Sequence, residues 1–157
     1  MTMRLFLFRK IIGRPEEKRS GRRGITYLKD DTRKLKSIYE RIERTMVEKQ
    51  PYLNGDFSVE DLSAMVCVSR AMISKALSRI GKKNFRPYIN GYRIRYSAKL
   101  IKEEPRMRLS EVARMSGFNS LPSFNAWFKS ETSKRPSEYL TEVWELPQTR
   151  FFSRKKE

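Results

Sequence analysis

The sequence has no histidine, and Cys67 is the only cysteine among its 157 residues. Without histidine the chain lacks the commonest general base and the usual imidazole ligand of zinc. A single cysteine can form neither an intrachain disulfide nor a thiolate cage around a metal ion. No pair of carboxylates stands in a motif that would complete an acid–base site. We therefore expect a protein that is not an enzyme and that needs no metal or other cofactor.

Long apolar runs are missing as well. The longest one near the start, Leu5–Phe8, ends at Arg9 and Lys10, whereas about 20 apolar residues are needed to span a bilayer. A secretory signal peptide needs a longer apolar run and a cleavage site of small residues. We expect a cytoplasmic protein, although the same short run would also fit the cytoplasmic edge of a membrane segment in a longer protein.

Acidic residues are scarce relative to basic ones. Eighteen Asp and Glu stand against 35 Lys and Arg, which gives a formal net charge of +17 and a pI near 10.3. A charge of this size makes a compact state repel itself and favours a polyanionic partner. Nucleic acid is the first candidate for that partner, and an anionic membrane surface is the second.

Both ends of the chain have the composition of appendages. Residues 1–27 scatter basic side chains among glycine and proline and predict a disordered arm. Residues 142–157 predict a C-terminal tail that is basic and frayed at Phe151–Glu157. Residues 28–55 predict one helix, at 32–49 and capped by Asp31 or Thr32, followed by a linker. Its apolar residues recur three and four apart, so they pack either against the rest of the domain or against a second copy: Leu35, Ile38, Tyr39, Ile42 and Met46.

Residues 56–84 predict two short helices around a tight turn, the signature of a helix-turn-helix. Ser58 and Asp61 form a capping-box pattern at the start of the first helix. Cys67 and Val68 interrupt that helix, and Ser69 can cap the second. The residues expected to face inward follow helical spacing: Leu62, Met65, Val66, Ile73, Ala76, Leu77 and Ile80.

The same pattern returns about fifty residues later, in residues 105–141. Gly117-Phe118 takes the place of Cys67-Val68 at the turn. Glycine adopts a left-handed conformation there without strain, whereas Cys67 pays about 1 kcal/mol or bends the chain differently. The inward positions correspond: Val112 and Met115 to Leu62 and Met65, and Phe124 and Phe128 to Ile73 and Leu77.

Residues 85–104 connect the two repeats. Phe85 to Ile101 carry apolar side chains on more than one side, as expected of a central helix that both repeats touch. Such a helix would be about 25 Å long, and successive major grooves on one face of a duplex lie about 34 Å apart. Glu104-Pro105 ends it, because the residue before proline avoids the helical conformation. The fold class that follows is all-α, with two helix-turn-helix subdomains joined by a linker helix.

Several separated motifs resemble the AraC/XylS family of bacterial transcription regulators. The segment LSEVARMSGFNSLPSFNAWFKSETSKRPSEYL, from Leu109 to Leu140, is similar to the family signature, and YINGYRIRYSAKLI, from Tyr88 to Ile101, is similar to its linker helix. The resemblance covers about residues 56–140 and implies a homeodomain-like fold and DNA binding. The matching positions within the signature are Gly117-Phe118, Phe124, Phe128-Lys129 and Pro136-Ser137-Glu138-Tyr139.

The chain departs from the family pattern at a few positions. Family members usually have a glycine just before the linker helix, where Lys82 stands here with Gly81 one place early. Ser133 replaces a second common glycine. Pro122 and Ala126 occupy recognition-helix positions at which polar side chains often contact bases.

The outward face of the first recognition helix is the predicted DNA-contacting face. Lys75 can donate to guanine O6 and N7, and Ser74 can donate or accept at a base edge. Arg and Ser side chains at its ends suit phosphates, which fix register without reading sequence. The alternative is a merely solvated face. The predicted contacts are Arg70, Ala71, Ser74, Lys75, Ser78 and Arg79.

In the second recognition helix the outward positions are Ser123, Asn125, Ala126 and Lys129. Asn125 can read adenine if its side chain reaches the base edge. Few base-reading groups remain, so we expect this repeat to contribute phosphate contacts and positioning more than discrimination. For Trp127, stacking on DNA sugars is the alternative to a buried position. The aromatic residues interpreted as core are Phe118, Phe124, Trp127, Phe128 and Tyr139.

The expected partners are double-stranded DNA and RNA polymerase or other transcription machinery. Family members often carry a separate sensor or dimerisation domain, and residues 1–55 are too short and polar for one. The chain is then a fragment, a small autonomous regulator or a truncated copy, and residues 32–49 are a candidate for self-association. The alternative function is a basic membrane-surface or protein-interaction module carried by residues 1–24 and 32–49, part of a larger membrane-linked regulator.

Overall fold

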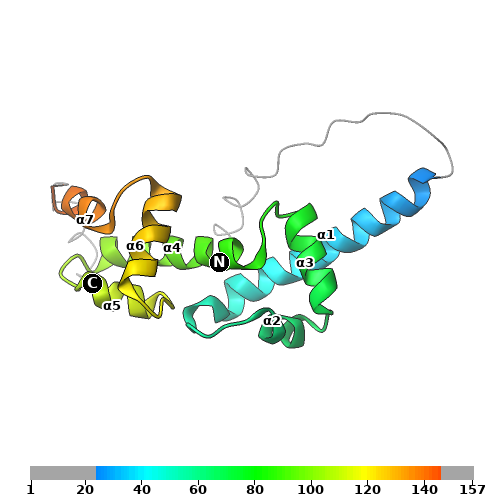
Figure 1. Ribbon diagram of the computed structural model, residues 1–157, viewed down its shortest axis with the longest axis horizontal. Helices are drawn as coiled ribbons and strands as arrows, with labels where there is room; N and C mark the ends of the chain where they lie inside the picture. Colours follow the sequence, from blue (N-terminus) through cyan, green and yellow to red (C-terminus); the bar gives the residue numbers. More distant parts are fainter. Residues whose placement is uncertain (1–23, 146–157) are drawn as a thin grey trace, which may run out of the picture. The chain divides into compact units, whose positions relative to one another are not determined.

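A computed structural model describes the backbone of residues 24–145 and the side chains of residues 31–144. Within that range the secondary structure is entirely helical, which confirms the predicted all-α fold (Figure 1). Most of the arm expected at residues 1–27, and the tail beyond residue 145, lie outside the described residues. The elements are α1 (Gly24–Lys49), the 3-10 turn η2 (Pro51–Leu53), α2 (Val59–Val66), α3 (Arg70–Arg79), α4 (Phe85–Glu103), α5 (Leu109–Met115), α6 (Leu121–Thr132) and α7 (Pro136–Glu145).

Helix α1 begins earlier than its sequence pattern predicts. It starts at Gly24 instead of residue 32, so residues 24–27 belong to the helix and not to the arm. Asp31 and Thr32 lie inside the helix, and the expectation that one of them caps it is wrong. Both residue types cost a helix interior only a fraction of a kcal/mol each, so neither ends a helix by itself.

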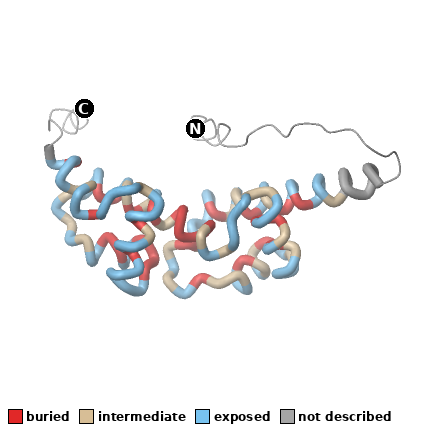
Figure 2. The backbone as a smooth tube through the Cα atoms, turned by 45° about the horizontal axis from the view of Figure 1, so that its top comes forward, coloured by how far each residue is buried: buried red, intermediate tan, exposed pale blue. Residues whose placement is uncertain are grey.

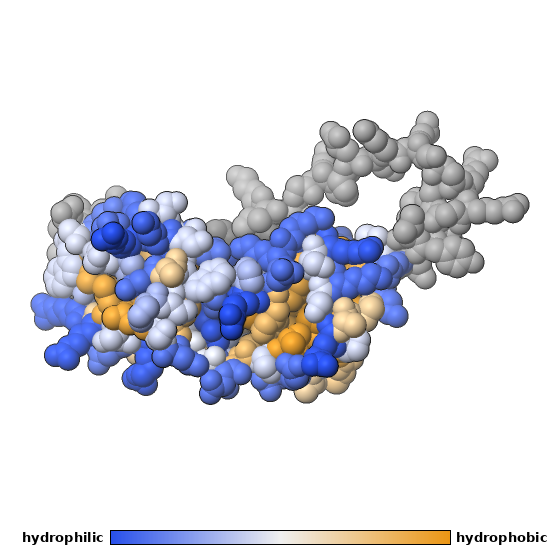
Figure 3. All heavy atoms as spheres, in the orientation of Figure 1, coloured by the Kyte–Doolittle hydropathy of each residue, from blue (hydrophilic) through white to orange (hydrophobic). Residues whose placement is uncertain are grey.

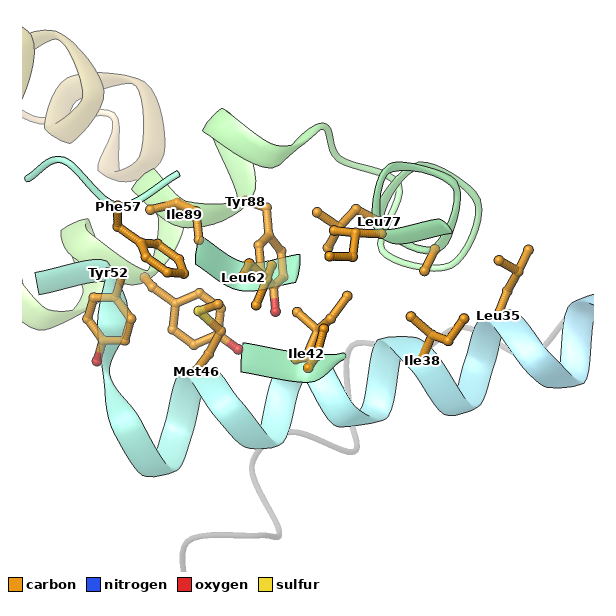
Figure 4. Close-up of a cluster of buried hydrophobic side chains, with 14 residues drawn as sticks. Leu35, Ile38, Ile42, Met46, Tyr52, Phe57, Leu62, Leu77, Tyr88 and Ile89 are labelled. Carbon is orange, nitrogen blue, oxygen red and sulfur yellow. The ribbon is translucent and has the colours of Figure 1, made fainter. Parts of the chain in front are cut away.

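The apolar stripe of α1 faces the chain's own core. Leu35, Ile38, Ile42 and Met46 are at most 6% exposed and lie against side chains of α2, α3 and α4 (Figure 4). The stripe therefore packs on the domain, the first of its two expected places, and self-association through residues 32–49 stays a prediction.

Hydrogen bonds also fasten α1 to α4. The hydroxyls of Tyr88 and Tyr92 donate to the two carboxylate oxygens of Glu43, at 2.9 and 2.5 Å. Burial raises the pKa of both hydroxyls above their ordinary value, and the neighbouring carboxylate raises it further. Both tyrosines therefore remain protonated donors at physiological pH.

The first helix-turn-helix consists of α2 and α3. Ser58 accepts from the Asp61 amide at 3.2 Å and its own amide donates to Asp61 Oδ2 at 2.9 Å, which confirms the capping box. Cys67 ends α2 with left-handed backbone angles, φ 49° and ψ 48°. Ser69 stands at the N-cap of α3, as expected, but its side chain makes no capping hydrogen bond.

The second helix-turn-helix consists of α5 and α6. Gly117 takes the predicted left-handed conformation, with φ 82°, and Phe124 and Phe128 are fully buried. Met115, expected to face inward, is 40% exposed. Helix α5 ends there, and the fully buried Ser116 points inward instead, its hydroxyl donating to the Val112 carbonyl at 2.7 Å.

Helix α7 completes the second core beyond the predicted boundary at residue 141. It runs to Glu145, and Val143 is only 7% exposed. The expected aromatic core is confirmed: the rings of Phe118, Phe124, Phe128 and Tyr139 form a chain of edge-on contacts with centroids 5.4 to 5.5 Å apart. Trp127 is half-buried against this core.

Helix α4 belongs to both cores, as expected of the linker helix. Tyr88, Ile89 and Tyr92 pack with α1, α2 and α3, whereas Ile94 and Ile101 pack with α5, α6 and α7. Its buried positions consequently surround the helix instead of forming one stripe. Figure 2 shows buried residues alternating with exposed ones along the tube. At 19 residues the helix is about 28 Å long.

Two non-glycine residues adopt left-handed backbone at the positions where the family pattern predicts glycine. Lys82, just before α4, has φ 56°, and Ser133, at the end of α6, has φ 62°. The turns therefore keep the geometry that glycine would allow, and each pays the steric cost of a Cβ atom.

Candidate nucleic-acid interface

The predicted contact residues of α3 share one exposed face. Ile73, Ala76 and Leu77 are fully buried and fix the helix on the first core. On the opposite side, five of the six predicted residues are exposed and Lys75 is half-exposed. The structure thus brings together a polar and cationic helix face that a groove could receive: Arg70, Ala71, Ser74, Lys75, Ser78 and Arg79.

Arg70 already has an acidic partner within the motif. Its guanidinium forms an ion pair with Glu60, which lies in the first turn of α2. The hydrogen bond from Arg70 is the main reason that the pKa of Glu60 lies below its ordinary value. Glu60 was not among the predicted site residues, because two side chains ten positions apart across a turn follow no periodic pattern that would pair them.

The exposed face of α6 is less charged than that of α3. Ser123, Asn125, Ala126 and Lys129 are all exposed, as predicted. Leu121 is 40% exposed beside them. Farther along the helix, Glu131 pairs with Lys83 of the α3–α4 loop at 3.5 Å. Lys129 is the basic residue of α6 itself.

Capping at the N-terminus of α6 fixes where this helix, and with it the exposed face, begins. Ser120 accepts from the Ser123 amide at 3.4 Å, and Pro122 stands in the first turn of α6, where no amide donor is needed. Hydrophilic residues cover most of the face seen in Figure 3, with apolar residues surfacing in separate areas. Such a surface suits a polar, wet interface better than an apolar one.

Metal-binding clusters and membrane-spanning helices are both absent from the part of the chain that the structure describes. In that part of the chain, no group of three or more His, Cys, Asp or Glu side chains could hold a metal ion. None of its helices is long and apolar enough to cross a membrane.

Known proteins resemble this arrangement. Residues 62–142 match the family described as a helix-turn-helix domain. The transcriptional activator RhrA of Rhizobium meliloti is 32% identical over 106 residues, 67% of this chain and 32% of that protein. The TCP pilus virulence regulatory protein of Vibrio cholerae is 38% identical over 80 residues, 51% of this chain and 28% of that protein. The chain thus spans about a third of the length of these curated relatives.

A solved structure shares the fold. The C-terminal domain of AraT, a response regulator from Geobacillus stearothermophilus, superposes with a TM-score of 0.59 at 18% identity, covering 76% of this chain and 91% of that one. At this identity the likeness concerns the fold alone.

Proposed function

Since the chain belongs to the AraC/XylS family of helix-turn-helix transcription regulators, we propose that it regulates transcription by binding a specific site on double-stranded DNA. The observation that carries the proposal is the exposed polar face of α3, opposite a fully buried apolar face. A helix anchored in this way can enter the major groove without losing its core contacts. The net charge of +17 supplies the attraction to phosphates.

Helix α3 is the principal reader of sequence in this proposal. Lys75 and Ser74 lie in the middle of the exposed face, where they would meet base edges, and Lys75 would select guanine. Arg79, in the last turn, would contact a phosphate and fix the register.

Helix α6 enters the neighbouring major-groove segment and contributes mainly position. Lys129 would contact phosphate, and Asn125 would pair with adenine if its side chain reaches the base edge. If this division of labour holds, Asn125→Ala causes only a small loss of specificity.

The partners beyond DNA are RNA polymerase or other transcription machinery and a sensor domain. Support comes from the relatives: one is named a transcriptional activator, and the matching parts cover only 32% and 28% of the two proteins. The alternative of a membrane-surface module has less support, because the apolar stripe of α1 is buried in the first core and offers no face to lipid.

A titration of labelled duplex, followed by fluorescence anisotropy at several salt concentrations, tests the proposal. Lys75→Ala is expected to cost about 1–3 kcal/mol on the preferred site and little on unrelated duplex. Arg79→Ala is expected to weaken all duplexes equally and to lower the salt slope by about one. Equal losses for Lys75→Ala on preferred and unrelated duplexes would contradict base reading by α3.

A further inference from the structure

The loop between α1 and α2 lies directly against the turn of the second helix-turn-helix. A Cβ atom on Gly117 would lie 2.4 Å from the Tyr52 carbonyl oxygen and 3.0 Å from that of Leu53. A Cβ on Gly55 would lie 1.9 Å from Asn119 Oδ1. The two segments approach more closely than side chains would allow. The loop that leads into the first helix-turn-helix therefore lies directly on the turn of the second, and α4 is not the only connection between them.

Arg93 of α4 lies at the centre of this contact. Its Nε donates to the Tyr52 carbonyl at 2.7 Å, and its Nη2 donates to the carbonyls of Asn54 and Gly55 at 2.8 and 3.3 Å. Its guanidinium carbon lies 5.7 Å from the centroid of the Phe118 ring, in the second motif's turn. One planar, permanently charged group therefore binds the α1–α2 loop by its edge and the second turn by its face.

Further polar contacts surround the same joint. Asn119 Nδ2 donates to Asp56 Oδ1 at 3.1 Å, which again links the second turn to the loop. The Lys83–Glu131 pair links the α3–α4 loop to α6, and both side-chain ends lie within 4 Å of where a Gly91 Cβ would be. Gly91 and Arg93 are two positions apart, about 200° around the helix. The linker helix is thus braced on opposite sides of its middle.

We propose that Arg93 is the positioning residue that fixes the orientation of the two helix-turn-helix motifs relative to each other, and with it the spacing of the two DNA blocks they accept. The part of this inference that concerns DNA spacing rests on the proposed function. One extra base pair between the blocks moves the second block by about 3.4 Å and turns it by about 34°. A rigid joint cannot follow that change, whereas a loose one can.

The joint is testable without DNA. Nitroxide labels on the exposed Cys67 of the first motif and on Ser130→Cys of α6 report the distance distribution between the motifs by pulsed electron resonance. The full chain is expected to give a narrow distribution, and Arg93→Met one of roughly twice the width. Arg95→Met is the matched control, because it removes the same charge from α4 while its guanidinium stacks on Tyr92 within the first core. Equal widths for Arg93→Met and Arg95→Met would overturn the proposal.

The effect on DNA spacing is the second readout. On duplexes selected from a random pool, inserting or deleting one base pair between the blocks is expected to cost the wild-type chain about tenfold or more in affinity. Arg93→Met is expected to lose less than about threefold, and Arg95→Met to behave as wild type. An unchanged spacing preference in Arg93→Met would contradict the inference. If wild type prefers no duplex, the proposed function fails, and the label distances still judge the joint.

Helical circular dichroism and the thermal midpoint check that Arg93→Met folds. Should it unfold, Arg93→Lys keeps the charge but loses the planar fork of donors that reaches the Tyr52, Asn54 and Gly55 carbonyls. Arg93→Lys is expected to give a wider distance distribution than wild type and Arg95→Met. A distribution as narrow as that of wild type would overturn the proposal in that case.

Discussion

Lys82 and Ser133 hold backbone conformations that glycine adopts at no cost. Ser133 has φ 62° and is exposed, and no hydrogen bond of its side chain offsets the strain. Ser133→Gly is therefore expected to stabilise the chain by roughly 0.5–1 kcal/mol, after the larger entropy of glycine in the unfolded chain is subtracted. Denaturant unfolding followed by circular dichroism measures it.

Ser130 provides the matched control for that substitution. It lies three residues earlier, inside α6 and exposed, so Ser130→Gly is expected to destabilise by about 0.5 kcal/mol. The same serine-to-glycine substitution is then expected to raise the free energy of unfolding at position 133 and to lower it at position 130. If both variants were less stable than wild type, the left-handed conformation of Ser133 would not lower the stability of the fold.

The ion pair between Glu60 and Arg70 occupies a side chain that the proposed function assigns to DNA. Glu60 also places a negative charge beside the phosphates that α3 would approach. Glu60→Gln is therefore expected to tighten duplex binding by roughly two- to fivefold at low salt, the range expected for an exposed pair. Anisotropy titration measures the change.

Glu103→Gln is the control for charge alone. Glu103 pairs with Lys99 on α4 and is about as exposed as Glu60. Glu103→Gln changes the net charge by the same amount as Glu60→Gln and is expected to leave the affinity for duplex nearly unchanged. Equal tightening by both variants would mean that Arg70 is not released by the loss of Glu60.

At the scale of elements, two serines at helix starts differ in what they contribute. Ser58 accepts a hydrogen bond from the Asp61 amide, whereas Ser69 makes no side-chain cap. Ser58→Ala is expected to cost about 1 kcal/mol of unfolding free energy, and Ser69→Ala only a few tenths. Equal costs in chemical denaturation would argue against the capping box.

The same box has a pH dependence. The side-chain and backbone bonds from Ser58 hold the pKa of Asp61 below its ordinary 3.8. A carboxyl with a lowered folded-state pKa stabilises the fold above its unfolded value, and that contribution is lost as pH falls through the folded value. The stability gap between wild type and Asp61→Asn should therefore be full at neutral pH and close below about pH 4.

The sequence predicts which segments are helices because their buried positions recur three and four residues apart. The stripes at Leu35–Met46 and Ile73–Leu77 both lie on the cores, as their spacing indicates. Boundaries were harder. Helix α1 runs through Asp31 and Thr32 because a capping residue ends a helix only when the preceding chain turns away. Met115 is exposed because α5 stops there, and a local pattern does not show which of two neighbours turns inward.

At the scale of the whole molecule, the candidate DNA-contacting faces followed from the sequence, but the joint between the motifs did not. Opposite a buried face there must be an exposed one, so the ten predicted contact residues lie outward or half outward. Arg93 joins segments about 40 positions away through backbone carbonyls. Every residue has a backbone carbonyl, so the sequence does not show which carbonyls a side chain will bind.

The number of phosphates that basic side chains contact across the molecule sets the salt response. If six to ten phosphates are engaged, duplex affinity should fall about 10³–10⁵-fold between 50 and 200 mM salt. A flat response in an anisotropy titration would contradict phosphate binding by the chain.

The central claim is that two helix-turn-helix motifs bind neighbouring segments of one duplex. Selection of tight binders from a random duplex pool, at physiological salt with competitor DNA, tests it most directly. We predict enrichment of one asymmetric site with two blocks about one helical turn apart, the block read by α3 being the more strictly defined. Salt-sensitive binding to every duplex with no enrichment, or no binding at all, would contradict the claim.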